Sequence, residues 1–303
     1  MTTVAVSPAR LVWRRLLRHR LAQASLVFVI VLLALSLAAP LIASLRGADP
    51  ATTDLLRRLE PPSAQNWLGT DDLGRDLFQR LLDGGRVSLM VGFAGALLSA
   101  VLGAVIGVVS GYTGGRFDGV MMRVTDGVIA LPLLPLLIVL AAIDPRKIGI
   151  PVEIAQSETF SLYRIVVIVG LTGWTTVARL VRAETLSLKH RDFARAARAL
   201  GARPARIMFR HILPNAAGSL VVATTMSIGT LILLESTLSF LGLGTQPPAA
   251  SWGNMLTGAQ ELLQDAPMQA VWPGLLIFLT VIAFNFLGDG LQDALDPRSE
   301  RRT

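Results

Sequence analysis

The 303-residue chain contains no cysteine and only two lysines, Lys147 and Lys189. Without cysteine it has no disulfide scaffold, no thiolate metal ligand and no cysteine nucleophile. Neither lysine follows a glycine, so the GxxxxGK[ST] pattern that cradles nucleotide phosphates is absent. The HExxH and GxSxG patterns of metallopeptidases and hydrolases are also missing. We therefore expect a chain that is not an enzyme and that binds no cofactor or metal itself.

Charge is scarce in this chain, and it is distributed unevenly. Charged residues make up 16% of the sequence, against about 25% in ordinary soluble domains, and the mean hydropathy is +0.57. Seven stretches carry no charge at all: 21–45, 87–115, 127–143, 165–178, 216–234, 236–260 and 266–288. Because a membrane-spanning helix needs about 20 mostly apolar residues, several of these stretches are long enough to cross a bilayer. This pattern excludes a soluble enzyme and a disordered protein.

The charge-free stretches predict an all-α membrane protein with six spans, near 21–45, 87–112, 120–143, 163–181, 216–243 and 271–288. The stretch 236–260 is not a seventh span, because it contains Gly242, Gly244, Pro247 and Pro248, followed by several polar residues. The third span contains Pro132 and Pro135, so we expect a bent helix packed against protein. Gly103, Gly107 and Gly111 follow a GxxxG spacing in the second span, which indicates either close helix packing or only the usual abundance of glycine in membranes.

Basic residues indicate how the spans are oriented. An even number of spans places both termini on one side, and 19 of the 28 Lys and Arg residues fall on that side. An excess of basic residues marks the cytoplasmic face, so we expect both termini in the cytoplasm. The net charge of +7 is therefore a topology signal and does not indicate nucleic-acid binding.

The cytoplasmic stretch 191–215 reads RDFARAARALGARPARIMFRHILPN and predicts two short helices that project from the membrane. Asp192 is the expected cap of the first helix, and Gly201 is the expected terminating glycine. One apolar face is expected to combine Phe193, Ala196, Ala197 and Leu200. A second helix is expected to start at Pro204, to carry Ile207, Met208 and either His211 or Ile212, and to stop before Pro214. On periodicity alone, a basic helix bound to anionic lipid is the alternative.

The same stretch resembles the EAA motif of ABC-importer permeases, in which E-A-A is followed by three residues, a glycine, nine residues and I-x-L-P. Ala196 and Ala197 occupy the two alanine positions, Gly201 the glycine position, and Leu213 and Pro214 the closing pair. The chain departs from the motif at two positions, with Arg195 in place of glutamate and His211 in place of isoleucine. In this family the loop docks onto the ATP-binding subunit. The resemblance therefore implies ATPase-coupling residues at Arg195, Ala196, Ala197, Leu200, Gly201, His211, Leu213 and Pro214.

Four further stretches resemble the C-type permease subunit of the dipeptide/oligopeptide/nickel branch of this family. They are WLGTDDLGRDLFQRLLDGGRVSL (67–89), LTGWTTVARLVRAETLSLK (171–189), ESTLSFLGLGTQPPAASWGNML (235–256) and FNFLGDGLQDALDPR (284–298). Together with the EAA-like loop they cover most of the chain from residue 67 onward, in family order. The loop at 144–161 has no distinctive match and is longer than the usual external loop.

The resemblance implies a type I importer permease of the bacterial inner membrane that forms half of a pathway for peptides or related small solutes. Its implied partners are a homologous permease subunit, two ATP-binding subunits that carry ATP and Mg²⁺, and an extracytoplasmic substrate-binding protein, with membrane lipid around the spans. The expected organisation is a cytoplasmic segment at 1–20, a first helix at 21–45, an external loop with an interfacial helix at 46–86 and a cytoplasmic tail at 291–303. A five-helix core at 87–290 is expected to contain the coupling loop at 184–215 and an external loop at 245–270.

Glu235 is the one acid deep within an apolar stretch, in the outer part of the fifth span. An intramembrane carboxylate is costly, so it marks either a solvated pathway or a structural hydrogen bond to a Ser or Thr on a neighbouring helix. Upstream of the second span, the apolar stripe at 77–82 suits a helix lying on the outer interface, and GTDDLGRD predicts turns and a helix cap.

Two other classes of protein share some of these features. An ATP-independent secondary transporter or channel usually places paired charges or broken helices at mid-membrane, and here only Glu235 is a candidate. A membrane anchor that only scaffolds a complex has no need of the glycine-rich packing in the second span. Neither alternative accounts for the EAA-like loop.

Overall fold

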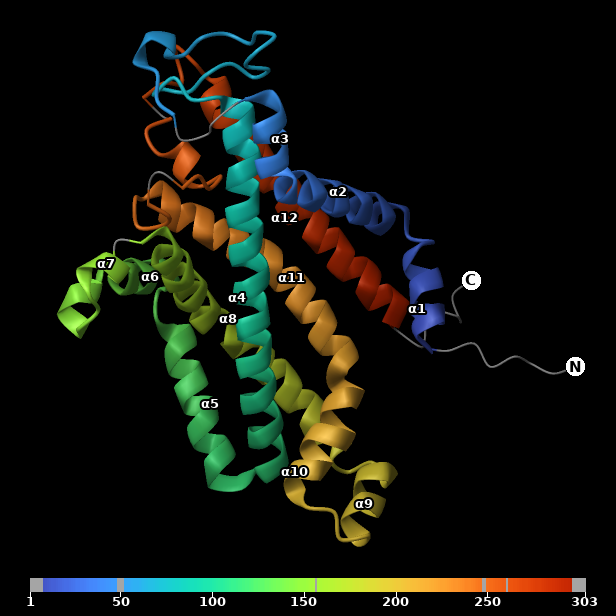
Figure 1. The fold of residues 1–303 in the computed structure, drawn as a ribbon. Coiled ribbons are helices and arrows are strands. Elements are labelled where there is room, and N and C mark those ends of the chain that lie inside the picture. The colour runs from blue at the N-terminus through green and yellow to red at the C-terminus, as the bar shows by residue number, and fades with distance from the viewer. Residues whose placement is uncertain (1–7, 48–51, 156, 247–248, 260, 296–303) are drawn as a thin grey trace, which may run out of the picture.

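The computed structural model of the chain describes residues 8–47, 52–155, 157–246, 249–259 and 261–295 (Figure 1). Within these ranges it is helical, with no strand and one isolated bridge between Thr70 and Asp76. Five helical segments are long and apolar enough to cross a membrane, and a sharply bent helix pair brings the number to six. This agrees with the expected all-α architecture of six spans.

The first expected span, 21–45, is two helices rather than one. Helix α2 covers Arg20–Leu37 and α3 covers Ala39–Arg46, with the break at Ala38. Pro40 lies in the first turn of α3, where a proline without an N–H starts a helix more readily than it continues one. The break lets α3 turn away from α2 along the side of the bundle (Figure 1).

Helices α4 (Leu77–Thr113) and α8 (Glu158–Leu188) make the largest helix contact in the fold. The glycine stripe of α4 lies in this contact. A Cβ at Gly103 would lie 2.5 Å from the Val177 Cβ, and one at Gly107 would lie 2.6 Å from the Ala178 carbonyl oxygen. The GxxxG spacing therefore allows α4 and α8 to approach closely, which decides between the two interpretations of these glycines.

The expected interfacial helix at 77–86 does not exist as a separate element, because α4 runs without a break from Leu77. Leu77, Leu81 and Leu82 are buried in protein rather than laid on a bilayer surface. The paired Gly84 and Gly85 do not end the helix, since both are packed closely against other parts of the chain. The helix therefore begins ten residues before the span boundary expected at residue 87, which itself stays a prediction.

The third span is bent by 88° between α5 (Gly115–Ala130) and α6 (Leu133–Ala142). Pro132 caps α6, which confirms the proline bend. Within this chain much of the pair is exposed, because Thr125 is the buried residue of α5 and Leu137 and Ala141 are those of α6. Packing of the rest of the pair against protein stays a prediction. Several apolar residues of α5, such as Val120 and Val124, are exposed.

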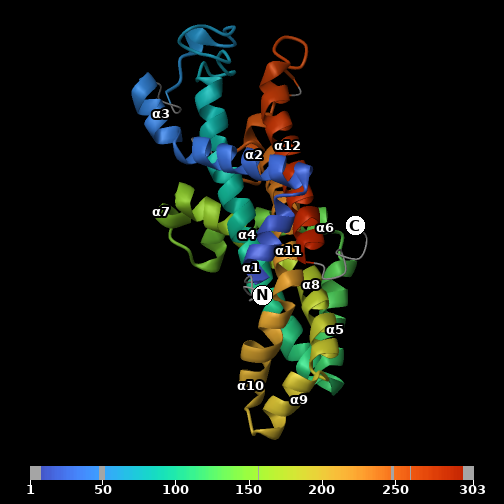
Figure 2. The same cartoon turned by 90° about the vertical axis from the view of Figure 1, so that its right-hand side faces the viewer.

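The other spans are α11 (Leu213–Phe240) and α12 (Met268–Leu295), which pack on each other and on α4 and α2. Helix α12 continues through the expected boundary at residue 290. The short helix α1 (Pro8–Leu16) lies against the end of α12, where Leu16, Ala22 and Ala294 form a small cluster (Figure 2). The two described ends of the chain are therefore neighbours, while residues 1–7 of the expected N-terminal segment and 296–303 of the tail lie outside the described residues.

Short helices complete the fold. The segment between α6 and α8 contains η2 (Pro145–Ile148) and α7 (Val152–Ala155). Between α3 and α4 lies η1 (Leu55–Arg57), and between α11 and α12 lies η4 (Asn254–Leu256). After α8 come α9 (Asp192–Ala199), α10 (Pro204–Arg206) and the π-helical η3 (Ile207–Ile212).

Candidate functional site: a projecting knob and a buried carboxylate

Residues 191–212, which we call the knob, form a hairpin of two short helical segments at one end of the molecule (Figure 1). Helix α9 ends at Gly201, whose φ of +78° lies in the left-handed region. The Ala202 N–H donates to the Ala197 carbonyl and the Gly201 N–H to the Arg198 carbonyl, which is a Schellman arrangement. Gly201 is thus the terminating glycine that the sequence predicts, and the turn it forms is tightly hydrogen-bonded.

The start of α9 and its buried face differ from the predictions. Arg191 is the capping residue, and Asp192 is the first residue of the helix. The buried residues are Ala194 and Ala197, whereas Phe193 is 37% exposed and Leu200 is 87% exposed. The expected apolar face is therefore wrong apart from Ala197, because the two alanines pack into a cluster with Val108, Val181, Ile207 and Ile212.

The second half of the knob continues into α11 without a break. Pro204 starts this helix as expected, but Pro214 does not interrupt it, because the π-helical η3 precedes the proline. The Leu213 N–H donates to the Met208 carbonyl, five residues back. This wider turn accommodates a proline that lacks an N–H, and it places Ile207 and Ile212, five residues apart, on one buried face.

Six of the eight predicted coupling residues lie in the knob, and Leu213 and Pro214 follow it directly at the start of α11, but the eight differ in exposure. Ala197 is buried, His211 and Leu213 are half-buried, and the others are exposed: Arg195, Ala196, Leu200, Gly201 and Pro214. The His211 carbonyl accepts a hydrogen bond from the Asn215 amide, 2.6 Å away. The knob therefore has a fixed inner face, which packs on α4 and α8, and an outer face that contacts no other part of the described chain at Leu200.

Glu235 lies fully buried in α11 and accepts hydrogen bonds from serines. The Ser239 hydroxyl donates to Oε1 at 2.7 Å, and the Ser88 hydroxyl of α4 donates to Oε2 at 3.0 Å. No Lys or Arg in the described ranges forms an ion pair with it. A hydrogen bond to a serine of a neighbouring helix is what the structural interpretation of Glu235 predicts, and Ser88 of α4 provides one. Hydroxyl donors reduce the free-energy cost of burying a carboxylate.

Above Glu235 lies a buried segment that the sequence did not indicate. We call residues 244–246 and 249–256 the plug. Its Trp252 is fully buried, its indole N–H donates to the Leu81 carbonyl at 2.9 Å, and its backbone N–H donates to the Ser88 hydroxyl at 3.2 Å. A chain of hydrogen bonds thus runs from Trp252 through Ser88 to Glu235. The one signal of this packing in the sequence is the glycine at position 85. A Cβ there would lie 2.9 Å from the Trp252 ring, so a larger residue would clash with the plug.

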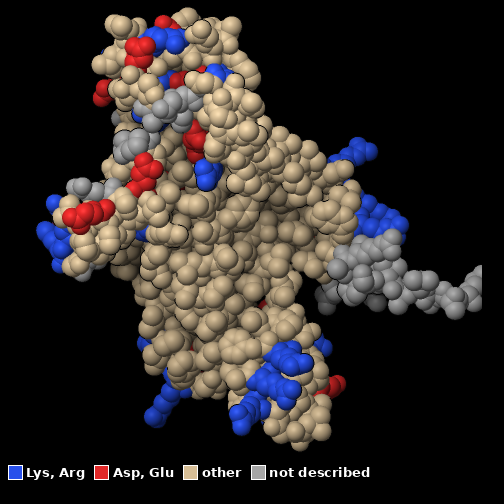
Figure 3. Space-filling model, in the orientation of Figure 1, with Lys and Arg blue, Asp and Glu red and all other residues tan. Residues whose placement is uncertain are grey.

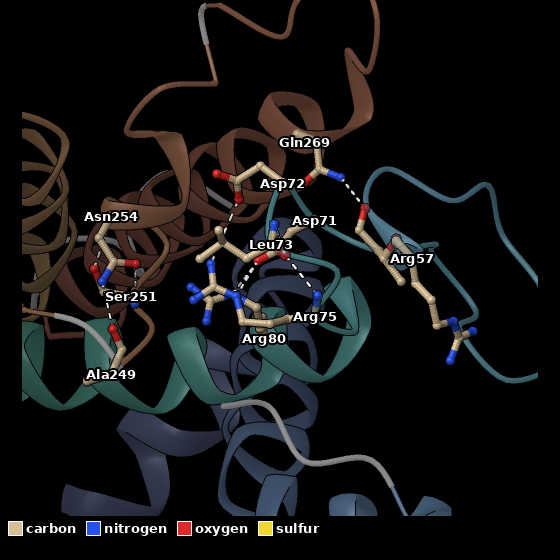
Figure 4. Close-up of polar contacts among 11 residues, drawn as sticks. Arg57, Asp71, Asp72, Leu73, Arg75, Arg80, Ala249, Ser251, Asn254 and Gln269 are labelled. Carbon is tan, nitrogen blue, oxygen red and sulfur yellow. Dashed lines mark hydrogen bonds and ion pairs between the residues drawn. The ribbon is translucent and has the colours of Figure 1, made fainter. Parts of the chain in front are cut away.

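The GTDDLGRD turn lies directly before α4 and is held by polar contacts around Asp71 (Figure 4). The Asp71 carboxylate accepts from the backbone N–H groups of Leu73 and Arg75 and from the Arg75 guanidinium at 2.7 Å, and it lies 3.2 Å from the Arg80 guanidinium. Asp76 caps α4 by accepting from the Gln79 N–H. The turn and cap predicted here are present, and the side chains are largely occupied with one another.

Charges at the knob end of the bundle also pair within the chain. Arg182 of α8 forms two hydrogen bonds of 2.6 Å to the Asp118 carboxylate of α5. Arg179 pairs with Asp126 in the same way along these two helices. Within the described residues no group of three or more His, Asp or Glu side chains could hold a metal ion. The described residues thus place the projecting knob at one end of the bundle and the plug with the GTDDLGRD turn at the other.

The fold and the knob define a multi-pass helical membrane protein of the transport-permease class. The chain belongs to the family described as binding-protein-dependent transport system inner membrane component, whose model matches residues 103–301. A second model, described as the N-terminal TM domain of oligopeptide transport permease C, matches residues 7–62. The resemblance seen in the sequence is thereby confirmed.

Curated relatives cover nearly the whole chain. The oligopeptide transport system permease protein OppC of Bacillus subtilis is 38% identical over 92% of this chain and 86% of its own length. The glutathione transport system permease protein GsiD of an Escherichia coli strain is 42% identical over 94% and 89%. The dipeptide transport system permease protein DppC of Alkalihalophilus pseudofirmus is 37% identical over 97% and 91%. A solved amino acid ABC transporter chain matches 69% of this chain and 90% of its own, at 19% identity and a TM-score of 0.46.

The chain is therefore a permease subunit of an ABC importer and a multi-pass component of the inner membrane. Membership in this family implies ATP-binding and substrate-binding partners. The relatives are permease proteins, in agreement with the non-catalytic role expected from the sequence. The alternative of an ATP-independent secondary transporter or channel is not favoured.

Proposed function

We propose that the chain forms half of the translocation pathway for peptides or related small solutes, beside a homologous permease subunit. The names of the relatives support the substrate class, since oligopeptides, dipeptides and glutathione are all short peptides. The outward-facing apolar side chains of α5 support a partner within the membrane, because they have little contact with the rest of this chain. Two ATP-binding subunits, which carry ATP and Mg²⁺, and an extracytoplasmic binding protein complete the proposed importer.

The observation that carries this proposal is the rigid, outward-facing knob. Its alanines pack onto the ends of α4 and α8, so a push on the knob is transmitted to the two helices with the largest mutual contact. Its tip, Leu200, is 87% exposed and is available to a partner. The proposed coupling site therefore consists of the predicted residues, with Leu200 as the contact at the tip and Ala197 as the internal anchor.

Charge supports the proposed orientation, in which the knob and both termini are cytoplasmic. On the face shown in Figure 3, basic side chains dominate at the knob end, whereas acidic side chains gather toward the opposite end. The contact between α1 and the end of α12 keeps both described ends on one side, as an even number of spans requires. The excess of basic residues on that side then favours the cytoplasm.

The opposite end is the proposed docking place of the binding protein. Exposed apolar residues gather there outside the spans, including Leu56 (96% exposed), Trp67 (54%) and Leu263 (52%). Exposed apolar residues on an extramembrane surface are typical of a protein-interaction site. The plug reduces the surface available for docking within the expected contact region at 245–270, because residues such as Trp252 are buried, whereas most of the described residues between 257 and 268 are exposed.

The test is co-purification of the permease pair with its ATP-binding subunits, together with the ATPase rate of the reconstituted complex. We expect Leu200→Asp to remove most of the bound ATP-binding subunits and the substrate-stimulated hydrolysis. Ala197→Glu combined with Gly201→Pro should have the same effect by a different route. That variant buries a carboxylate without a partner and imposes proline where φ is +78°.

Leu56→Asp is the matched control, because it places the same charge on an equally exposed leucine at the other end. It should keep the ATP-binding subunits bound and affect only stimulation by the binding protein. The proposal fails if Leu200→Asp retains both the subunits and the stimulated hydrolysis, or if the chain transports solute without ATP-binding partners.

A further inference from the structure

The knob carries positive charge that no acid in the described residues neutralises. It contains one acid, Asp192, and six arginines: Arg191, Arg195, Arg198, Arg203, Arg206 and Arg210. All six are exposed. In the part of the chain that the structure describes, none of them forms an ion pair with an acid, and Arg198 instead lies over the Tyr112 ring. By contrast, the neighbouring Arg179 and Arg182 are paired with acids of α5.

These arginines surround an apolar tip. Leu200 is 87% exposed, Phe209 44% and Phe193 37%. Protein interfaces commonly have an apolar centre with arginine enriched around it, and the charges of the rim select the partner through complementary sign. The knob therefore has the composition of one half of an interface with an acidic surface.

An anionic membrane is the other acidic surface that such a knob could meet, and the geometry disfavours it. A helix bound to a bilayer lays its apolar face into the headgroups. Here the buried alanines of α9, Ala194 and Ala197, face the protein cluster at the ends of α4 and α8. The two views show α9 at the extreme end of the molecule, while α10 lies level with the ends of α4 and α5 (Figures 1 and 2).

We infer that the ATP-binding subunit of this importer receives the knob in an acidic groove, with an apolar floor for Leu200 and carboxylates that face Arg195 and Arg203. The inference rests on the proposed coupling function and adds the chemistry of the partner. Arg195 stands at the glutamate position of the EAA motif, so the sign of the charge is reversed there relative to the motif. A groove with cations that suit a glutamate at this position would repel Arg195. The reversed charge at Arg195 therefore makes this permease selective for its own ATP-binding subunit.

The test uses the complete complex of both permeases and both ATP-binding subunits. Its probe variant is Arg195→Glu combined with Arg203→Glu. We expect the wild-type complex to hold its ATP-binding subunits less tightly as salt rises, because exposed charges are screened over about 10 Å at 0.1 M. The double reversal should weaken the association at low salt by roughly tenfold or more, since like charges then face each other. Arginine substitutions of the groove carboxylates in the partner should restore binding to the reversed knob.

Arg146→Glu combined with Lys147→Glu is the matched control, because it makes two charge reversals on an exposed segment remote from the knob. It should leave the association and its salt dependence unchanged. If the Arg195/Arg203 reversal keeps full association while Leu200→Asp loses it, the acidic groove is wrong and the docking function stands. If neither variant changes the association, the proposed function itself fails.

A membrane role has its own readout. Binding to vesicles of phosphatidylglycerol and phosphatidylcholine should be the same for the complexes with the wild-type and the reversed knob. If the reversal lowers vesicle binding and leaves the bound ATP-binding subunits unchanged, the arginines serve lipid, and the acidic groove is refuted.

Discussion

The knob and the plug are short segments that pack near opposite ends of α4, and they differ in whether their large apolar side chains are buried or exposed. The plug turns its largest side chain inward, so that Trp252 is fully buried, while the knob leaves Leu200 87% exposed. Polar groups of the plug are hydrogen-bonded within the chain, whereas the knob arginines have no acidic partner in the described residues. The difference indicates that the plug completes the bundle of this chain, and it supports the proposal that another chain covers the knob.

The largest expected effect on stability is at the plug. Trp252→Ala should lower the free energy of unfolding by about 3–5 kcal/mol, because it empties a buried site and leaves the Leu81 carbonyl without its donor. Leu200→Ala should change it by less than about 0.5 kcal/mol, because an exposed side chain loses few contacts. Thermal unfolding of the purified permease pair in detergent measures both variants. Equal shifts in the two midpoints would contradict the contrast between plug and knob.

A smaller effect is expected at the carboxylate beneath the plug. Glu235→Ala leaves the Ser88 and Ser239 hydroxyls without their acceptor, and we expect a loss of about 1–3 kcal/mol. Glu235→Gln should lose less, because its amide oxygen still accepts one of these hydrogen bonds. Comparing the two variants therefore separates the contribution of the Glu235 hydrogen bonds to stability from the contribution of its carboxyl group.

The cysteine-free sequence allows a direct readout of how the plug is held. A cysteine placed at the buried Ala250 should resist a membrane-impermeant maleimide in the wild-type background. It should react faster in Glu235→Ala and remain protected in Glu235→Gln. Equal protection in all three backgrounds would show that Glu235 does not hold the plug, and the alternative of a solvated pathway would then be examined first.

The spans could be predicted from the sequence because burial in a bilayer depends on local composition. Uncharged stretches located all the candidate spans, although those at 127–143 and 165–178 are by themselves shorter than a full span, and Pro132 marked the bend between α5 and α6. Gly201 was equally informative, since a glycine after an alanine-rich helix predicts the left-handed residue that the structure has there.

The rest depends on contacts between distant segments. The cap in GTDDLGRD indicates a helix that starts near Leu77, but nothing local shows that this helix is continuous with the second span, because its continuity through Gly84 and Gly85 depends on the plug packed against them. The prediction of the buried face of α9 was wrong because an alanine-rich helix of eight residues has two apolar faces. Which of the two faces is buried depends on the cluster that α9 forms with α4 and α8. The π-helical turn before Pro214 also changes which residues are buried, because Ile207 and Ile212 lie five residues apart, whereas an α-helix would bury residues that are four apart. Trp252 lies outside any periodic segment and carries no helical signal.

The smallest effect is expected at Asp144, which caps η2 and pairs with Arg146 at the surface, 2.7 Å apart. The hydrogen bond from the Arg146 side chain, followed by that from its backbone N–H, lowers the pKa of Asp144 from 3.8 to about 2. A carboxyl with a lowered pKa stabilises the fold above its unfolded pKa, and this contribution is lost as the pH falls through about 2. Because water screens the pair, Asp144→Asn should leave the unfolding midpoint unchanged at about pH 7, and a pH series of midpoints measures this. A clear drop at neutral pH would mean that surface charge stabilises this fold, and the knob arginines would then need to be tested for stability before partner binding.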